Sequence, residues 1–179
     1  ERQLKNPKKY KSKAPAESME KLLFICPKCK GYGTLSSKGD TVSCSKCKLS
    51  FKYNEYGMIE GLKQKTVKEL SDMQKQYVLA DVKNNVEYFT DDTEISTVKN
   101  HEESFVAKGR FVMSKEGITC GDFSLSMEDI TEFAMHGQNA LVFSAGKDYY
   151  EAITPKDTNA LKYMLYYERC KLTQTEAVK

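Results

Sequence analysis

The spacing of hydrophobic positions changes several times along the first half of the chain, and each change predicts a different element. Residues 16–24 place their apolar side chains on helical spacing, which predicts a short helix. Residues 24–61 hold short β-type segments broken by glycines, which predicts small hairpins. Residues 66–83 return to helical spacing without Gly or Pro. Because Thr66 is followed three residues later by Glu69, a capping-box pattern, we expect a helix to begin there.

The second half of the chain alternates apolar and polar positions with the period of a β-strand. Four apolar residues of the first such stretch are predicted to share one face: Phe105, Ala107, Phe111 and Met113. Turn signals then separate five further strand-like segments, which predicts an antiparallel meander. Asp157 or Thr158 can cap a final helix that runs to about Lys171. The residues expected to cover the sheet from this helix are Leu161, Met164, Leu165 and Tyr167.

Four of the six cysteines form two matched pairs, each with two residues between its members. Fourteen residues separate Cys26-Pro-Lys-Cys29 from Cys44-Ser-Lys-Cys47, a loop long enough to bring both pairs around one ion. Four thiolates are a typical ligand set for tetrahedral zinc. Disulfides would need an oxidising compartment, for which the sequence has no export signal, and a thioredoxin-like site would need a single CxxC within a βαβ unit. The pattern therefore predicts structural Zn²⁺, with no coordination position left open for catalysis.

The other reactive side chains are isolated in the sequence. Cys120 and Cys170 are interpreted as ordinary buried or half-buried thiols, and His101 and His136 lie in separate segments and receive no catalytic role. The sequence has no GxGxxG, Walker or GxSxG motif. We therefore predict no catalytic and no cofactor-binding residues besides the zinc ligands.

Charge is distributed unevenly along the chain. Residues 1–65 carry 15 Lys and Arg against 6 Asp and Glu, whereas residues 66–179 carry 13 against 19. The basic first part fits a phosphate-bearing partner, either a nucleic acid or a lipid surface, although a merely solvated lysine-rich surface is an equal alternative. No stretch approaches the roughly 20 apolar residues of a membrane helix, so we expect a soluble cytoplasmic protein.

One segment resembles a known family of enzymes. Phe24-Ile-Cys-Pro-Lys-Cys29 and, after the second pair, Lys52-Tyr-Asn-Glu-Tyr-Gly57 are the matching features. Over residues 14–62 the chain resembles the region that follows the catalytic domain in clostridial-type bacterial 1-acylglycerol-3-phosphate (lysophosphatidate) acyltransferases, and the likeness continues loosely to the final helix. It departs from the usual zinc-knuckle pattern where Lys30 and Lys48 replace the glycine that often follows the second cysteine.

The resemblance implies an accessory region without its own catalytic residues. Members of that family use a His-x-x-x-x-Asp motif, but the position that should hold aspartate is Val106 after His101 and Leu141 after His136. The catalytic residues are therefore expected in an upstream domain before Glu1, and the absence of an initial methionine fits a processed product or a piece of a longer protein.

The second half resembles a pleckstrin-homology (PH) or GRAM-like module. This likeness implies recognition of a lipid headgroup or a protein, with Lys108, Arg110 and Lys115 as candidate basic contacts, and the alternative is a scaffold that only packs. The predicted fold is α+β: a small zinc ribbon, a linking helix, and a PH-like antiparallel sheet or barrel capped by a C-terminal helix. The expected boundaries are a flexible basic arm 1–13, zinc ribbon 14–62, linking helix 63–84, β domain 85–173 and tail 174–179.

The leading functional hypothesis is therefore a non-catalytic region of a phospholipid-biosynthesis acyltransferase, acting with an upstream domain at the inner face of the cell membrane. Two alternatives remain open. One is a protein-interaction adaptor. The other is a nucleic-acid-binding zinc ribbon that stacks bases on nearby aromatic rings. The rings concerned are Tyr32, Phe51, Tyr53 and Tyr56.

Overall fold

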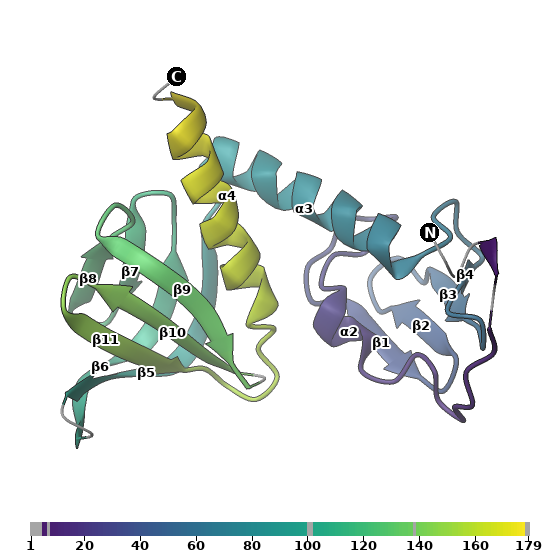
Figure 1. Ribbon diagram of the computed structural model, residues 1–179, viewed down its shortest axis with the longest axis horizontal. Helices are drawn as coiled ribbons and strands as arrows, with labels where there is room; N and C mark the ends of the chain where they lie inside the picture. Colours follow the sequence, from purple (N-terminus) through teal and green to yellow (C-terminus); the bar gives the residue numbers. More distant parts are fainter. Residues whose placement is uncertain (1–4, 7, 100–101, 138, 178–179) are drawn as a thin grey trace. The chain divides into compact units, whose positions relative to one another are not determined.

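The protein is α+β and contains two antiparallel sheets, as the sequence predicts (Figure 1). The computed structural model describes residues 5–6, 8–99, 102–137 and 139–177. Its chain divides into two compact units, Glu1–Gln76 and Tyr77–Lys179. The division falls inside helix α3 (Val67–Lys83), so a single helix supplies residues to both units.

The first unit is built on a four-stranded antiparallel sheet with the order β1-β2-β3-β4, which confirms the predicted hairpins. Its strands are β1 (Leu35–Lys38), β2 (Thr41–Cys44), β3 (Ser50–Tyr53) and β4 (Ile59–Glu60). The helix expected over residues 16–24 is only one turn long, α2 (Met19–Leu22). It ends early because Leu23 is extended and Ile25 forms a β-bridge with Tyr32, which a continued helix would prevent.

The first half of α3 completes the core of this unit rather than serving as a free linker. Leu70 is fully buried among the sheet residues, and Val67 and Met73 pack against the same cluster. The predicted helix start is confirmed, because the Glu69 backbone N–H donates to Thr66 Oγ1 at 3.2 Å. The Glu69 carboxylate in turn accepts a hydrogen bond from the Lys65 N–H at 2.8 Å. The first bond satisfies a backbone donor of the first helical turn that has no intrahelical partner. The second satisfies a backbone donor just before the helix.

The second unit is a seven-stranded antiparallel sheet with the order β8-β7-β6-β5-β11-β10-β9. The strands are β5 (Tyr88–Lys99), β6 (Glu102–Met113), β7 (Gly117–Cys120), β8 (Phe123–Ser126), β9 (Ile130–His136), β10 (Ala140–Ala145) and β11 (Asp148–Ile153). All predicted strand segments are present, but they form two meanders joined by the pairing of β5 with β11. The edge strands β8 and β9 are not paired with each other. The described strands therefore form an open sheet and not the closed barrel that was the alternative prediction.

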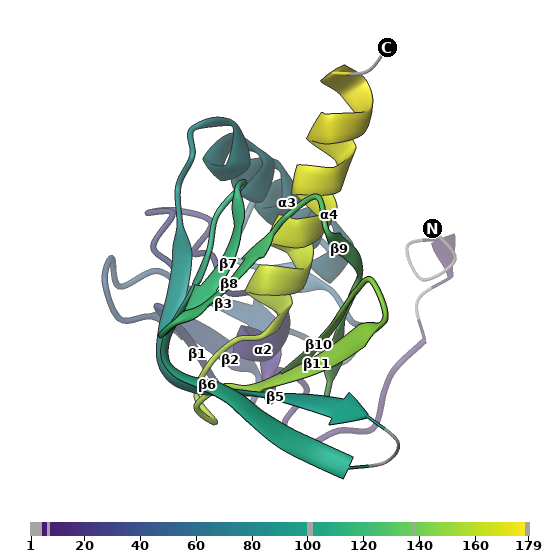
Figure 2. The ribbon, with the colours of Figure 1, turned by 90° about the vertical axis from the view of Figure 1, so that its left-hand side faces the viewer.

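Helix α4 (Leu161–Ala177) runs along the hollow side of the curved sheet (Figures 1 and 2). Aromatic pairs fix it there: the ring centroids of Tyr163 and Phe111 are 5.1 Å apart, and those of Tyr166 and Tyr88 are 4.6 Å apart. The helix continues past the predicted end near Lys171 and through part of the expected tail. Of the four residues predicted to cover the sheet, only Leu165 is fully buried, and the most buried face is instead formed by Tyr163, Tyr166 and Cys170.

One predicted core residue lies on the opposite face of its strand. Ala107, Phe111 and Met113 are buried as expected, but Phe105 is 66% exposed. The pairing of β6 with β5 changes register here, because Ile95 opposes Ala107 whereas the next residue, Ser96, opposes Phe105. A strand that gains one unpaired residue turns its following side chains to the other face, which explains the exposure of Phe105.

Candidate metal centre

The two cysteine pairs sit on turns of nearly identical backbone geometry. In the first, the Cys26 N–H donates to the Gly31 carbonyl, and the Lys30 N–H donates back to the Cys26 carbonyl, both at 3.0 Å. In the second, Cys44 donates to the Leu49 carbonyl at 2.8 Å and accepts from the Lys48 N–H at 3.1 Å. The same offsets along the chain produce the same loop twice, so each turn presents two sulfur atoms in the same way.

Backbone N–H groups point at the first sulfur of each turn. The amides of Lys28 and Cys29 hydrogen bond to the sulfur of Cys26, and those of Lys46 and Cys47 make the equivalent bonds to Cys44. Hydrogen bonds of this kind stabilise a thiolate, because the amide dipoles face the negative charge. In each turn these bonds favour the ionised sulfur, against the burial that opposes it.

The structure brings all four predicted ligands together. The sulfurs of Cys26, Cys29, Cys44 and Cys47 lie within 4.8 Å of one another. The Cys26–Cys47 and Cys29–Cys44 sulfur distances are both 3.7 Å. Around a tetrahedral zinc ion with bonds of about 2.3 Å, the sulfurs are about 3.8 Å apart, whereas a disulfide needs about 2.05 Å. The arrangement can hold a metal ion and is compatible with zinc.

The pKa values of the Cys26 and Cys44 thiols are shifted in opposite directions. Burial raises the pKa of the Cys26 thiol to about 12. Burial also opposes ionisation of Cys44, but hydrogen bonds with the Thr34 hydroxyl and the backbone amide of Cys47 outweigh it, so the pKa of Cys44 is lowered to about 6. Four thiolates this close together repel one another, and a bound divalent cation removes that repulsion.

The two lysines that replace the usual glycine keep the turn conformation. Lys30 and Lys48 have φ values of 56° and 60°, in the left-handed region that glycine adopts at little cost. Both lie directly after the second cysteine of a pair. The departure from the glycine pattern therefore leaves the metal-binding geometry intact, at the expense of local backbone strain.

A buried glutamine supports the approach to the first cysteine pair, and the sequence analysis did not single it out. Gln74 of α3 is 1% exposed. Its side-chain oxygen accepts hydrogen bonds from the N–H groups of Phe24 at 2.8 Å and Ile25 at 3.2 Å. Its side-chain nitrogen donates to the Leu22 carbonyl at 3.1 Å. The sequence did contain a signal for this residue. Gln74 lies four positions after Leu70 and four before Val78, on the buried stripe of the helix, where an apolar residue is expected.

The remaining candidate residues that the structure describes lie on three separate elements, Cys120 on β7, His136 on β9 and Cys170 on α4. His136 is exposed, with Nδ1 3.0 Å from Oε1 of Glu151, and His101 lies outside the described residues. Cys120 and Cys170 are both buried, in line with their interpretation as ordinary thiols, and burial raises the pKa of each. Of the described side chains, His136 pairs with one carboxylate at the surface and the two thiols are buried, which is not an arrangement suited to nucleophilic catalysis.

The three basic residues proposed to contact a headgroup each face a carboxylate. Lys108 lies 3.4 Å from Glu94, Arg110 lies 3.8 Å from Asp91, and Lys115 lies 3.9 Å from Glu116. The Arg110 guanidinium also stacks on the Phe89 ring, 3.8 Å from its centroid. These acidic neighbours reduce the attraction of β6 for an anionic bilayer.

Most of the aromatic rings proposed to stack on bases are buried or in contact with other side chains. Phe51 is buried in the core, and Tyr53 packs against that core. Lys9 lies over the Tyr56 ring, 5.2 Å from its centroid, and pairs with Glu55 at 2.5 Å. Tyr32 is 40% exposed, with Phe24 beside it.

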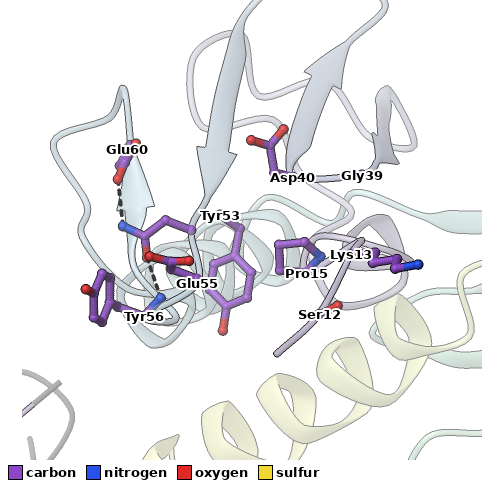
Figure 3. A pocket seen from close by; sticks show the side chains of 10 residues that line it. Ser12, Lys13, Pro15, Gly39, Asp40, Tyr53, Glu55, Tyr56 and Glu60 are labelled. Atoms are coloured by element: carbon purple, nitrogen blue, oxygen red, sulfur yellow. Dashed lines mark hydrogen bonds between the residues drawn. The ribbon is translucent and has the colours of Figure 1, made fainter. Parts of the chain in front are cut away.

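The Lys-Tyr-Asn-Glu-Tyr-Gly segment that carries the family resemblance forms a compact turn. Asn54 Oδ1 accepts hydrogen bonds from the N–H groups of Tyr56 and Met58, both at 3.0 Å. Figure 3 shows this turn beside residues 12–15. Residues of both segments line a hollow of about 550 Å³. The three acidic side chains that line the hollow are already engaged, because Asp40 pairs with Lys52, Glu55 pairs with Lys9, and Glu60 accepts a hydrogen bond from Asn54. The segment therefore has a clear structural role.

No protein-family model matches the chain, and no curated protein matches it significantly. Among the residues that the structure describes, no helix has both the length and the apolar character needed to cross a membrane.

Proposed function

We propose that this chain is a non-catalytic accessory region of a phospholipid-biosynthesis acyltransferase, in which a structural zinc ion stabilises the first unit. The observation that carries the non-catalytic role is the closed set of four sulfurs around one point. Zinc held by four thiolates has no position for a water or a substrate, so it stabilises a fold and does not activate a nucleophile. The sulfur distances and the soft thiolate ligands both support zinc as the metal.

The acyltransferase assignment is supported by the segments that carry the resemblance. The first cysteine pair and the turn of residues 52–57 both belong to the first unit, and both have a definite structural role there. In this proposal the transfer of an acyl group to lysophosphatidate is carried out by an upstream domain with a His-x-x-x-x-Asp motif. The chain positions that domain or regulates it.

The second unit is proposed to be a PH-like module. Counting its strands from β5 to β11 as one to seven, their order in the sheet is 4-3-2-1-7-6-5, and a C-terminal helix packs on the hollow side. The PH-like resemblance implies a bent antiparallel sheet with such a C-terminal helix. Since Lys108 and Arg110 of β6 face carboxylates, we favour a role in positioning the enzyme over headgroup recognition on β6 itself.

Contact with the membrane is proposed for the first unit instead. The two cysteine turns carry exposed lysines directly beside the ligands, namely Lys28, Lys30, Lys46 and Lys48. Lysines near an anionic bilayer contribute about 1 kcal/mol each, so such a cluster supports peripheral binding at the inner face of the cell membrane. The nucleic-acid alternative has less support, because Phe51 is buried and Lys9 lies over the ring of Tyr56.

The gene sequence upstream of Glu1 tests the proposal first, and a His-x-x-x-x-Asp motif is expected there. The second test is an assay of acyl transfer from an acyl thioester to lysophosphatidate. We expect turnover from the joined protein and none from the isolated chain, and the His136→Ala change should leave the joined protein active. An upstream sequence without the motif, or turnover by the isolated chain, would overturn the proposal.

A further inference from the structure

A hollow of about 380 Å³ lies in the second unit between the end of α3 and the last turns of α4. Val82, Lys83 and Asn85 line it from the α3 side, Lys115 lines it from the β6–β7 turn, and α4 supplies Cys170, Thr173 and Gln174. Val82 and Cys170 are buried and form an apolar wall. The hydrogen bond from Tyr166 Oη to the Val86 carbonyl at 2.7 Å holds the end of α3 against α4.

The charge of the hollow is opposite to that of the unit around it. Residues 66–179 carry six more acidic than basic side chains, yet the lining of the hollow includes two lysines and no carboxylate. One carboxylate stands at the edge of the hollow, because Glu116 lies 3.9 Å from Lys115 and, after burial, contributes to the raised pKa of Cys170. Lys83 and Lys115 are exposed residues of separate elements, and both line the same hollow. Two cations brought together in an acidic unit favour an anionic ligand.

Neutral donors complete the lining. Asn85 and Gln174 contribute side-chain amides, whereas the Thr173 hydroxyl already donates to backbone carbonyls of α4. Carbonyl groups without hydrogen-bond partners at the end of a helix would repel an anion. Several of the carbonyls at the end of α3 accept hydrogen bonds instead. The N–H groups of Asn84, Asn85 and Val86 donate to the carbonyls of Ala80, Val82 and Asp81 at 3.0, 3.2 and 2.9 Å.

We propose that this hollow binds a phosphate group, with Lys83 and Lys115 as the cationic contacts and the amides of Asn85 and Gln174 as additional donors. A phosphate monoester carries a charge of about −1.5 to −2 at neutral pH and three acceptor oxygens, which suits two lysines and two amides. The phosphate can belong to a small soluble molecule or to a lipid headgroup. The proposal rests on this cavity and its charges and does not depend on the metal centre or on the acyltransferase assignment.

An NMR titration of the full ¹⁵N-labelled chain tests the proposal, with inorganic phosphate and then glycerol 3-phosphate as probes. We expect saturable shifts at the backbone amides of Asn85, Lys115 and Gln174. Lys83→Ala and Lys115→Ala should each weaken binding about tenfold, whereas Lys147→Ala, in the turn after β10, should leave it unchanged. Lys83 also lies in the last turn of α3, so thermal unfolding without phosphate shows whether a lost affinity reflects only a less stable helix.

Vesicles distinguish the two sources of phosphate. Phosphatidylcholine vesicles with and without phosphatidate are added to the chain and to the Lys83→Ala, Lys115→Ala double variant. Binding of phosphatidate vesicles that the double variant loses supports a lipid headgroup, and binding of soluble phosphate alone supports a small ligand. Shifts confined to the lysines of the first unit, or equal binding by the double variant and the original chain, would refute the site.

Discussion

The side-chain oxygen of Gln74 lies 2.8 Å from the backbone nitrogen of Phe24, although fifty residues separate them in the chain. This contact ties α3 to the extended segment that leads into Cys26. Because the helix also contributes Leu70 to the core, the first unit includes part of what the sequence presents as a linking helix.

Replacing Gln74 should therefore destabilise the first unit. Gln74→Leu leaves the buried N–H groups of Phe24 and Ile25 without acceptors, and we expect the free energy of unfolding to fall by about 2–4 kcal/mol. Hydrogen exchange at these two amides measures the change. Gln76→Leu, at an exposed position on the same helix, is the matched control and should change little. Unaltered exchange at Phe24 in Gln74→Leu would show that the contact is not important in solution.

The metal centre should bind one zinc ion per chain. Cys44→Ser is expected to abolish binding and to unfold the first unit up to about Gln76, because metal binding supplies folding energy to a small core. The second unit has its own core and should stay folded. Elemental analysis and hydrogen exchange measure the two effects. Cys120→Ala removes a buried thiol of the second unit and should leave the zinc content at one. Acidification should release the metal, since protons compete for the thiolates.

The left-handed lysines predict an unusual stabilising substitution. Lys48→Gly should raise the stability of the metal-bound first unit by about 0.5–1 kcal/mol, because glycine adopts a φ of 60° without steric cost. Lys46→Gly, two residues earlier and without a positive φ, should lower the stability instead. Hydrogen exchange within the turn compares the two variants. Equal destabilisation by both changes would contradict the strain at Lys48.

Gly117 at the start of β7 has no room for a side chain. A Cβ atom at this position would lie 2.0 Å from the Leu125 carbonyl oxygen of β8. Gly117→Ala should therefore destabilise the second unit by at least about 2 kcal/mol. Gly146→Ala is the control, because its φ of +60° is also unfavourable but a Cβ atom meets no neighbour within 4 Å. Chemical denaturation, followed by the near-ultraviolet signal of the second unit's tyrosines, compares the stability of the two variants. A similar loss of stability in both variants would contradict the close approach of β8.

The register change in β6 predicts opposite consequences for two phenylalanines of one strand. Phe105→Ser should alter stability by less than about 0.5 kcal/mol, since this side chain is 66% exposed. Phe111→Ala should cost about 3–5 kcal/mol, because Phe111 is fully buried against Tyr163. The same denaturation experiment measures both. A large loss in Phe105→Ser would mean that the strand is paired without the register change.

The sequence by itself determined the local features of this protein. The four candidate metal ligands were predicted as a group, because the two cysteines of each pair are only three positions apart in the sequence. They are Cys26, Cys29, Cys44 and Cys47. The start of α3 at Thr66 was predicted because a capping box lies within one helical turn. Six of the seven strands of the large sheet were predicted, β6 from its period of two and the others from turn signals between them, whereas β5 was not singled out. In each case the physical cause acts between neighbours in the chain.

Only the tertiary structure decided the features that depend on distant partners. The pairing of β5 with β11 joins two meanders, and no local pattern specifies which strands meet. Phe105 follows the strand period of its neighbours, yet a register change relative to β5 turns it outward. Gln74 is polar on an apolar stripe, and its burial makes sense only when the free amides of Phe24 and Ile25 are placed opposite it. These outcomes depend on hydrogen bonds and packing between segments far apart in the sequence, which periodicity does not encode.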